Sequence, residues 1–333
     1  MAELAEKAGS ALKSILDVVS GEKLLIFCDE EKKDVAEVFI KGGIKAGLWT
    51  RTIMMQGGKE NRKEVKPEIL EALIGSKPDV CLNFLRSNIK ETPFRISLIK
   101  LETRLKCRLG HCPGVNMEML ENGALSLSEK EQQEMKDYAR RLIRKMHGAA
   151  KITVKDSKGT NLIFSVAGRD FFTDSIFDWK SNKWMNLPTG EITVGPVEDS
   201  LEGRLVCDGG IGGIGPIDSP LILDVEKGKV RKIQCRNLKI KKLVEDALGK
   251  DEWASVVGEF AVGINKKAKI PQEFLEMEKK LGTVHFAFGH NLDFPGGKNP
   301  STNHLDFLIS KPDVTVFRED KRSESFIKDG RIM

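Results

Sequence analysis

The chain has 333 residues and a net charge of +5, with 40% apolar and 31% charged residues, as in ordinary globular proteins. This length exceeds the size at which a single hydrophobic core usually stops growing, so we expect two domains. Basic and acidic residues are interspersed, with no block of like charge, which argues against a nucleic-acid partner.

The distribution of cysteines and the length of the apolar runs indicate where in the cell the protein occurs. No run approaches the roughly 20 apolar residues that span a bilayer, and the first residues lack the apolar stretch of a signal peptide. Six cysteines are scattered along the chain without a Cys-x-x-Cys pair, and Cys28 and Cys81 lie inside apolar runs. Such thiols suit a reducing compartment. We expect a cytoplasmic protein with no membrane partner.

The first third of the chain alternates between extended and helical patterns. A continuous apolar run, typical of a strand buried on both faces, covers residues 24–30, and residues 48–55 and 79–85 also have extended patterns. Helical spacing of apolar residues occurs between and after them, at 34–46, 66–75 and 92–104. Strands separated by helices predict βαβ units with a parallel sheet.

A long charged helix is predicted over residues 128–148, opening with a capping box at Ser128 and Glu131. Beyond it the pattern changes to short alternating runs, beginning with a hairpin at 151–166, with one clear helix near 239–249. The predicted fold is therefore an N-terminal α/β domain at 1–148, followed by a mostly β (α+β) domain at 149–333.

Two motifs suggest sites that their surroundings do not support. GGIGGIG at 209–215 contains the dinucleotide pattern G-x-G-x-x-G, but two prolines and a strand-like run follow it where that fold needs a helix. Cys107 and Cys112 flank His111, as in some zinc sites, but no second Cys/His pair lies nearby.

Residues 285–308 hold three of the five histidines in the chain. His304 and Asp306 are two residues apart, so in a strand their side chains point to the same face. His285 lies in another apolar run that is typical of a strand. Two imidazoles and a carboxylate are a sufficient set for zinc, iron(II), manganese or cobalt, and we predict a metal site here.

Three glutamates occur in similar apolar settings. Glu191 stands at the start of a predicted strand, Glu259 is flanked by apolar residues, and Glu278 lies seven residues before His285. Buried carboxylates are costly unless they are paired or bind a cation. Together with the histidines they exceed the needs of one ion, which favours two ions ~3.5–4 Å apart.

At these residues the chain resembles the aminopeptidase T/aminopeptidase S family of metallo-aminopeptidases, closest to its shorter members. The motifs NLPTGE, GEFAVGIN, EKKLGTVHFAFG and His-x-Asp occur in the family's order and spacing. The resemblance covers essentially the whole chain. It implies two domains with the metal site in the C-terminal one, a peptide substrate and a homodimer.

The resemblance also assigns roles to residues. It implies metal ligands at Glu191, Glu259, His285, His304 and Asp306, with Asp306 or Glu191 as the bridge between two zinc, cobalt or manganese ions. A metal-activated hydroxide would attack the scissile carbonyl. Glu259 or Glu278 would move the proton.

One position departs from the family. Peptidase members carry a tyrosine seven residues after the first histidine, where this chain has Leu292, and His290 would have to supply the missing hydrogen bond. The same pattern also resembles a ring-cleaving 2,5-dihydroxypyridine dioxygenase, in which one Fe(II) is held by two histidines and an aspartate. A metal-stabilised binding protein is a third possibility, but structural zinc sites are usually rich in cysteine and histidine.

Overall fold

The structure is a computed structural model that describes residues 2–55, 60–105, 107–180, 183–270, 272–320 and 322–333. It contains two compact units. Unit 1 consists of Met1–Asp137, Asp174–Thr189 and Lys266–Lys269, and unit 2 consists of Tyr138–Thr173, Gly190–Asn265 and Ile270–Met333. The chain thus returns to unit 1 twice. The predicted division into domains at residue 148 stays a prediction.

Unit 1 contains the predicted parallel sheet, which has five strands in the order β2-β1-β3-β4-β8. The strands are β1 (Lys23–Asp29), β2 (Trp49–Met55), β3 (Val80–Leu85), β4 (Arg108–Pro113) and β8 (Trp184–Asn186). The first three match the predicted runs within about one residue. Strands β4 and β8 were not predicted, because they are short and contain polar residues.

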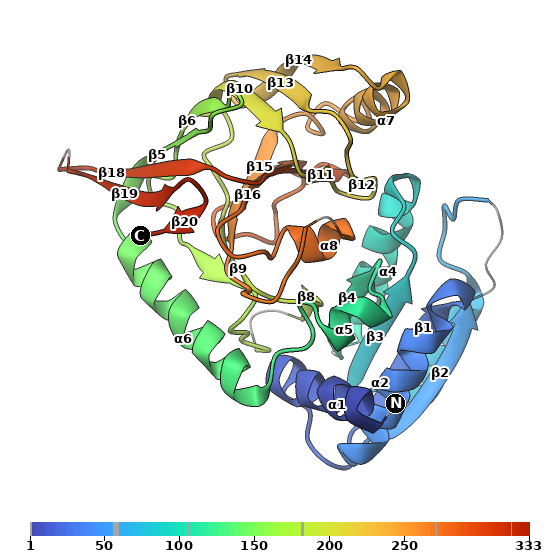
Figure 1. The fold of residues 1–333 in the computed structure, drawn as a ribbon. Helices are drawn as coiled ribbons and strands as arrows, with labels where there is room; N and C mark the ends of the chain where they lie inside the picture. Colours follow the sequence, from blue (N-terminus) through green and yellow to red (C-terminus); the bar gives the residue numbers. More distant parts are fainter. Residues whose placement is uncertain (1, 56–59, 106, 181–182, 271, 321) are drawn as a thin grey trace. The chain divides into compact units, whose positions relative to one another are not determined.

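Helices cover both faces of this sheet (Figure 1). They are α1 (Ala2–Leu16), α2 (Lys33–Lys45), α3 (Pro67–Ser76), α4 (Thr92–Arg104) and α5 (Met117–Glu121), with 3-10 turns at Glu30–Lys32 and Ile89–Glu91. α3 and α4 share one core cluster with Leu25, Phe27 and Leu109. α1 packs closely on α2 because Gly42 has no side chain, and a Cβ there would lie 2.7 Å from the Gly9 nitrogen.

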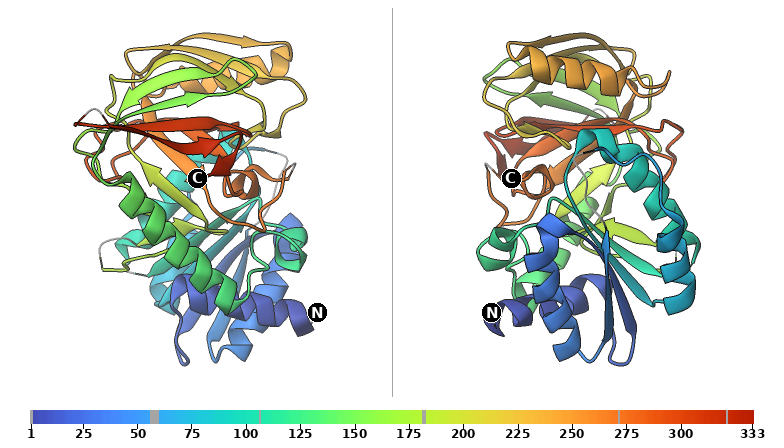
Figure 2. Two further views of the ribbon diagram at one scale, coloured as in Figure 1. Left: turned by 60° about the vertical axis from the view of Figure 1, so that its left-hand side comes forward. Right: turned by 90° about the vertical axis from the view of Figure 1, so that its right-hand side faces the viewer.

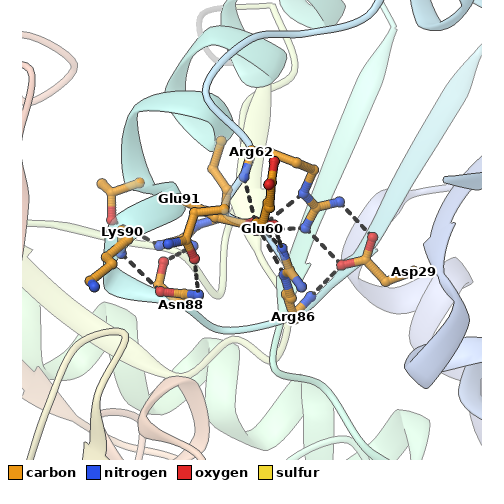
Figure 3. Close-up of polar contacts among 10 residues, drawn as sticks. Asp29, Glu60, Arg62, Arg86, Asn88, Lys90 and Glu91 are labelled. Atoms are coloured by element: carbon orange, nitrogen blue, oxygen red, sulfur yellow. Dashed lines mark hydrogen bonds and ion pairs between the residues drawn. The ribbon is translucent and has the colours of Figure 1, made fainter. Parts of the chain in front are cut away.

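A buried ionic network joins the carboxyl ends of β1 and β3 (Figure 3). Arg62 binds both oxygens of Asp29 at 2.5 and 2.8 Å and contacts Glu91 at 2.7 Å, while Arg86 also pairs with Glu91. Burial raises the pKa of Glu91, but hydrogen bonds from Arg86 and Arg62 outweigh it and lower that pKa to about 2. The network attaches residue 62 to the end of the sheet.

The Cys107, His111 and Cys112 side chains lie in or beside β4, and all three are buried in the core of unit 1. Burial, with a contribution from Arg95, lowers the pKa of His111 to about 3, so its imidazole is neutral. Within the described ranges these three side chains belong to none of the groups that could hold a metal ion.

Unit 2 consists mainly of two sheets, as predicted for the C-terminal part. The eight-stranded antiparallel sheet has the order β14-β13-β10-β6-β5-β18-β19-β20. Its strands are β5 (Ala149–Lys155), β6 (Asn161–Ser165), β10 (Glu202–Cys207), β13 (Leu221–Glu226), β14 (Lys229–Cys235), β18 (Asp313–Arg318), β19 (Ser323–Lys328) and β20 (Arg331–Ile332). The predicted hairpin corresponds to β5 and β6, which pair in antiparallel register.

The second sheet has seven strands in the order β12-β11-β17-β16-β15-β9-β7. They are β7 (Phe172–Thr173), β9 (Glu191–Val194), β11 (Gly210–Ile211), β12 (Gly215–Pro216), β15 (Val257–Gly263), β16 (Val284–Gly289) and β17 (His304–Ile309). The GGIGGIG motif forms the short pair β11 and β12. Strand β13 follows this pair, as the strand-like run after the motif predicts.

Unit 2 also contains helices. α7 (Leu238–Leu248), the predicted helix, runs beside β14 (Figure 2), and α8 (Phe274–Met277) precedes Glu278. α6 (Glu129–Met146) begins in unit 1 and continues into unit 2. Its capping box is confirmed, since the Ser128 amide donates to Glu131 Oε2 at 2.9 Å. None of the described helices is long and apolar enough to cross a membrane.

An aromatic core joins the two sheets of unit 2. The ring of Phe164 on β6 lies 5.0 Å from that of Phe260 on β15 and 5.3 Å from that of Phe286 on β16. These packed rings lie on one face of the seven-stranded sheet. Because side chains alternate along a strand, their immediate neighbours in sequence project from the opposite face.

Candidate metal centre

The predicted ligands lie on four adjacent strands of the seven-stranded sheet. Glu191 begins β9, Glu259 lies on β15, His285 on β16, and His304 and Asp306 on β17. In the register, Glu259 and Asp306 both pair with Ala287, and His285 pairs with Ala261. All five side chains therefore project from the face opposite the aromatic core.

Small residues make room for this cluster. Ala287 separates Glu259 from Asp306 across the strands, Ala261 lies beside His285, and Gly289 pairs with His304. Larger side chains at these positions would occupy the space into which the carboxylates and imidazoles converge. The motifs GEFAVG and HFAFG thus contain both the site side chains Glu259 and His285 and the small residues that leave space for them.

Three groups of side chains bring their ligand atoms within 4.8 Å of one another: Glu191–Glu259–His285, Glu259–His304–Asp306 and Glu278–His285–Asp306. The closest approaches are 3.1 Å from His304 Nε2 to Glu259 Oε2 and 3.3 Å from the same nitrogen to Asp306 Oδ1. His285 Nε2 lies 3.5 Å from Glu191 Oε2 and 3.7 Å from Glu259 Oε1. These separations allow one cation to bind several of the groups together.

The charges of the clustered side chains favour the binding of a cation. Burial raises the pKa of Glu259, but hydrogen bonds from His285 and His304 outweigh it and hold that pKa well below its usual range. Burial lowers the pKa of His285, but Glu259 and Glu191 outweigh it and raise it to about 9. Protons on the imidazoles thus balance the carboxylates when no ion is bound, and a metal would displace them.

Hydrogen bonds outside the cluster orient its members. His304 Nδ1 lies 2.9 Å from the backbone oxygen of His290, which turns Nε2 toward Glu259 and Asp306. Thr193 Oγ1 donates to Glu259 Oε1 at 2.7 Å. Such partners of metal ligands fix their geometry. Thr193 was not predicted as a site residue, although its position two residues after Glu191 on the same strand places it on the same face.

The predicted catalytic residues have different surroundings. Glu278 is buried, which raises its pKa, and it belongs to one of the three groups. The ring of His290 instead contacts the Ser301 oxygen at 3.1 Å and Asp293 at 3.3 Å, outside all three groups. Leu292 is half exposed at 52%. A catalytic role for His290 stays a prediction.

Lys279 is a further member of the cluster that was not predicted from the sequence. Its side chain is buried among the carboxylates, with Nζ 2.5 Å from Glu191 Oε1 and 2.9 Å from Glu278 Oε1. The local sequence EMEKK is strongly charged and resembles a solvated surface segment, so it contains no signal of burial.

Comparison with known proteins supports the same chemistry. A family model described as thermophilic metalloprotease (M29) matches residues 126–332. No curated protein matches the chain. AmpT from Thermus thermophilus has a similar structure, with a TM-score of 0.75, 16% identity, and coverage of 100% of this chain and 99% of that chain.

A second similar structure is 2,5-dihydroxypyridine dioxygenase from Pseudomonas putida KT2440. Its TM-score is 0.69 at 14% identity, with coverage of 100% of this chain and 97% of that chain. At these identities both likenesses show the fold alone, and they confirm the predicted fold class. The family model covers more than half of the chain, which therefore belongs to the M29 family of thermophilic metalloproteases and is a metallopeptidase.

Proposed function

We propose that the protein is an aminopeptidase that removes N-terminal residues from peptides with the help of a divalent metal ion bound by the cluster on β9, β15, β16 and β17. The observation that carries this proposal is the set of three overlapping ligand groups in a chain of a metallopeptidase family. Carboxylate oxygens and imidazole nitrogens suit zinc, cobalt or manganese.

The residues present fit such an ion. Nδ1 of His285 is buried and has no hydrogen-bond partner among the described residues, while its Nε2 faces Glu191 and Glu259. A bound divalent ion supplies a nucleophile at neutral pH by lowering the pKa of water and polarises the scissile carbonyl.

The overlap of the groups limits how two ions would bind. His285 belongs to two groups, and each of its ring nitrogens can bind only one ion. Two ions that each use a separate histidine would be held by Glu259–His304–Asp306 and by one of the groups that contain His285. The two groups would have Glu259 in common in one combination and Asp306 in the other. Glu259–His304–Asp306 is common to both.

The chain's own residues supply the remaining functions. Glu278 is buried, and burial raises the pKa of its carboxyl group above the usual range, so we assign it proton transfer to the leaving amine. Thr193 and the backbone oxygen of His290 hold Glu259 and His304 in place. Leu292 stands where the peptidase relatives have a tyrosine, and we assign His290 the missing hydrogen bond to substrate.

The alternative is a mononuclear Fe(II) dioxygenase, suggested by the fold shared with the Pseudomonas putida enzyme. That chemistry needs His285, His304 and Asp306 around one ion. Among the described residues, none of the three groups contains both histidines. This arrangement favours the peptidase.

The test is turnover by the purified protein loaded separately with zinc, cobalt, manganese or iron(II). We expect hydrolysis of amino-acid p-nitroanilides and short peptides, and no hydrolysis of the same peptides with an acetylated amino terminus. Cleavage of the acetylated peptides would refute the aminopeptidase assignment. Oxygen uptake on a dihydroxypyridine by the iron form, without peptide hydrolysis, would establish the alternative.

We also propose a cytoplasmic homodimer. All six cysteines are free, and five of them are buried, which suits a reducing compartment. The dimer rests on the resemblance to the aminopeptidase T/aminopeptidase S family, and sedimentation of the purified protein would test it.

A further inference from the structure

Lys279 is a buried cation inside the cluster of acidic ligands. Its side chain is 1% exposed, and Nζ contacts Glu191 Oε1 at 2.5 Å and Glu278 Oε1 at 2.9 Å. Lysine is almost never fully buried unless it is paired. Its backbone is held on both sides, since its amide donates to the Glu276 oxygen at 3.1 Å and its oxygen accepts from the Asn265 amide at 2.8 Å. The ammonium is therefore fixed in place.

The contacts of Lys279 distinguish the three ligand groups. Glu191 belongs to the group with Glu259 and His285, and Glu278 belongs to the group with His285 and Asp306. The ammonium thus contacts one carboxylate in each group that contains His285. The remaining group, Glu259–His304–Asp306, contains neither Glu191 nor Glu278.

We infer that the Lys279 ammonium takes the place of a second metal ion, so that the centre binds one divalent ion tightly, at Glu259, His304 and Asp306. Three physical effects act together. The ammonium neutralises part of the charge of Glu191 and Glu278, occupies one oxygen of each, and repels a divalent cation near the other oxygen. This inference departs from the two-ion expectation drawn from sequence.

Lys279 acts as a positioning residue. Because its side chain is buried it has no access to substrate, and it affects the centre only through Glu191 and Glu278. A structural ion pair alone would change stability when removed. If Lys279 controls the metal content, its replacement will change the number of bound ions. The number of bound ions is therefore the quantity to measure.

The experiment is metal binding to the metal-stripped protein, with zinc or manganese alone, by calorimetry and by elemental analysis after gel filtration. We expect one tight ion for the wild type and for Lys279→Arg. Lys279→Met removes the charge at similar length, and we expect it to bind a second ion at least about tenfold more tightly than the wild type does. Lys280→Met, the same change at the neighbouring, partly exposed lysine, should still bind one ion.

Two equally tight ions in the wild type would overturn the inference, as would a folded Lys279→Met protein that still binds only one. If Lys279→Met does not fold, Lys279→Gln replaces it. Anomalous scattering from wild-type crystals grown with cobalt tests the number of ions independently. A strong anomalous peak beside Glu191 would contradict the assignment of a single ion to Glu259, His304 and Asp306. The inference rests on the metal-binding part of the proposed function alone. Since ion counting needs no turnover, a failed peptidase assay leaves this test intact.

Discussion

At the scale of single residues, Glu259 is the most connected member of the cluster. It belongs to two of the three ligand groups, accepts a hydrogen bond from Thr193, and lies near both histidines. Desolvation of a buried carboxylate destabilises the folded protein unless a cation or an imidazolium compensates its charge. Its removal should therefore affect every arrangement of ions.

Glu259→Gln keeps the shape of the side chain and removes its charge. We expect metal affinity and peptide turnover to fall at least about 100-fold, because an amide is a poor ligand for these ions. Calorimetric titration with zinc and a p-nitroanilide assay measure the two effects. Glu226→Gln, an exposed change on β13, is the matched control. Normal metal content in Glu259→Gln would show that this carboxylate is not a ligand.

At the scale of elements, the end of β16 determines where β17 begins. Gly289 has a φ of +111°, and a Cβ there would lie 2.1 Å from the Asn303 oxygen. It pairs with His304, the first residue of β17. The glycine that ends HFAFG thus permits the strand pairing that delivers His304 and Asp306 to the cluster.

Gly289→Ala combines an unfavourable φ with a clash against backbone. We expect the free energy of unfolding to fall by about 2–4 kcal/mol and metal affinity to fall with it. The control is Gly168→Ala, where φ is +70° but no atom lies within 4 Å of an added Cβ, so only the conformational cost of about 1 kcal/mol remains. Urea unfolding compares them. Equal losses in the two proteins would contradict the proposed role of the close contact.

At the scale of the whole molecule, contacts between segments distant in sequence hold the elements together. In unit 1, Glu91 receives hydrogen bonds from Arg62 and Arg86, and Arg62 also binds Asp29 (Figure 3). The Glu91 side chain is fully buried, so its charge depends on these partners. The network makes the stability of this unit depend on pH.

The pKa of Glu91 is lowered from 4.5 to about 2 in the folded chain. Its contribution, about 3 kcal/mol, is therefore present above pH 4.5 and is lost as pH falls toward 2. We expect Glu91→Gln to be less stable than the wild type at pH 7, with the difference shrinking below pH 4.5. Three of the four tryptophans, Trp49, Trp179 and Trp184, belong to unit 1, so fluorescence during urea unfolding follows this unit. A difference that does not change with pH would refute this account.

The sequence by itself determined several of the elements and the chemical character of the site. Apolar runs predicted β1, β2 and β3, helical spacing predicted the helices between them, and the His-x-Asp and glutamate motifs identified six of the residues that gather in the cluster. These features are local, because burial on one or both faces leaves a periodic pattern in the chain.

Only the tertiary structure decided which strands are neighbours and in which register. That order places Ala287 between Glu259 and Asp306, and it sets the ring of His290 outside the ligand groups. It also buries Lys279 between Glu191 and Glu278. No local pattern marks these features, because the pairing partners of a strand and the surroundings of a charged side chain depend on segments up to a hundred residues away.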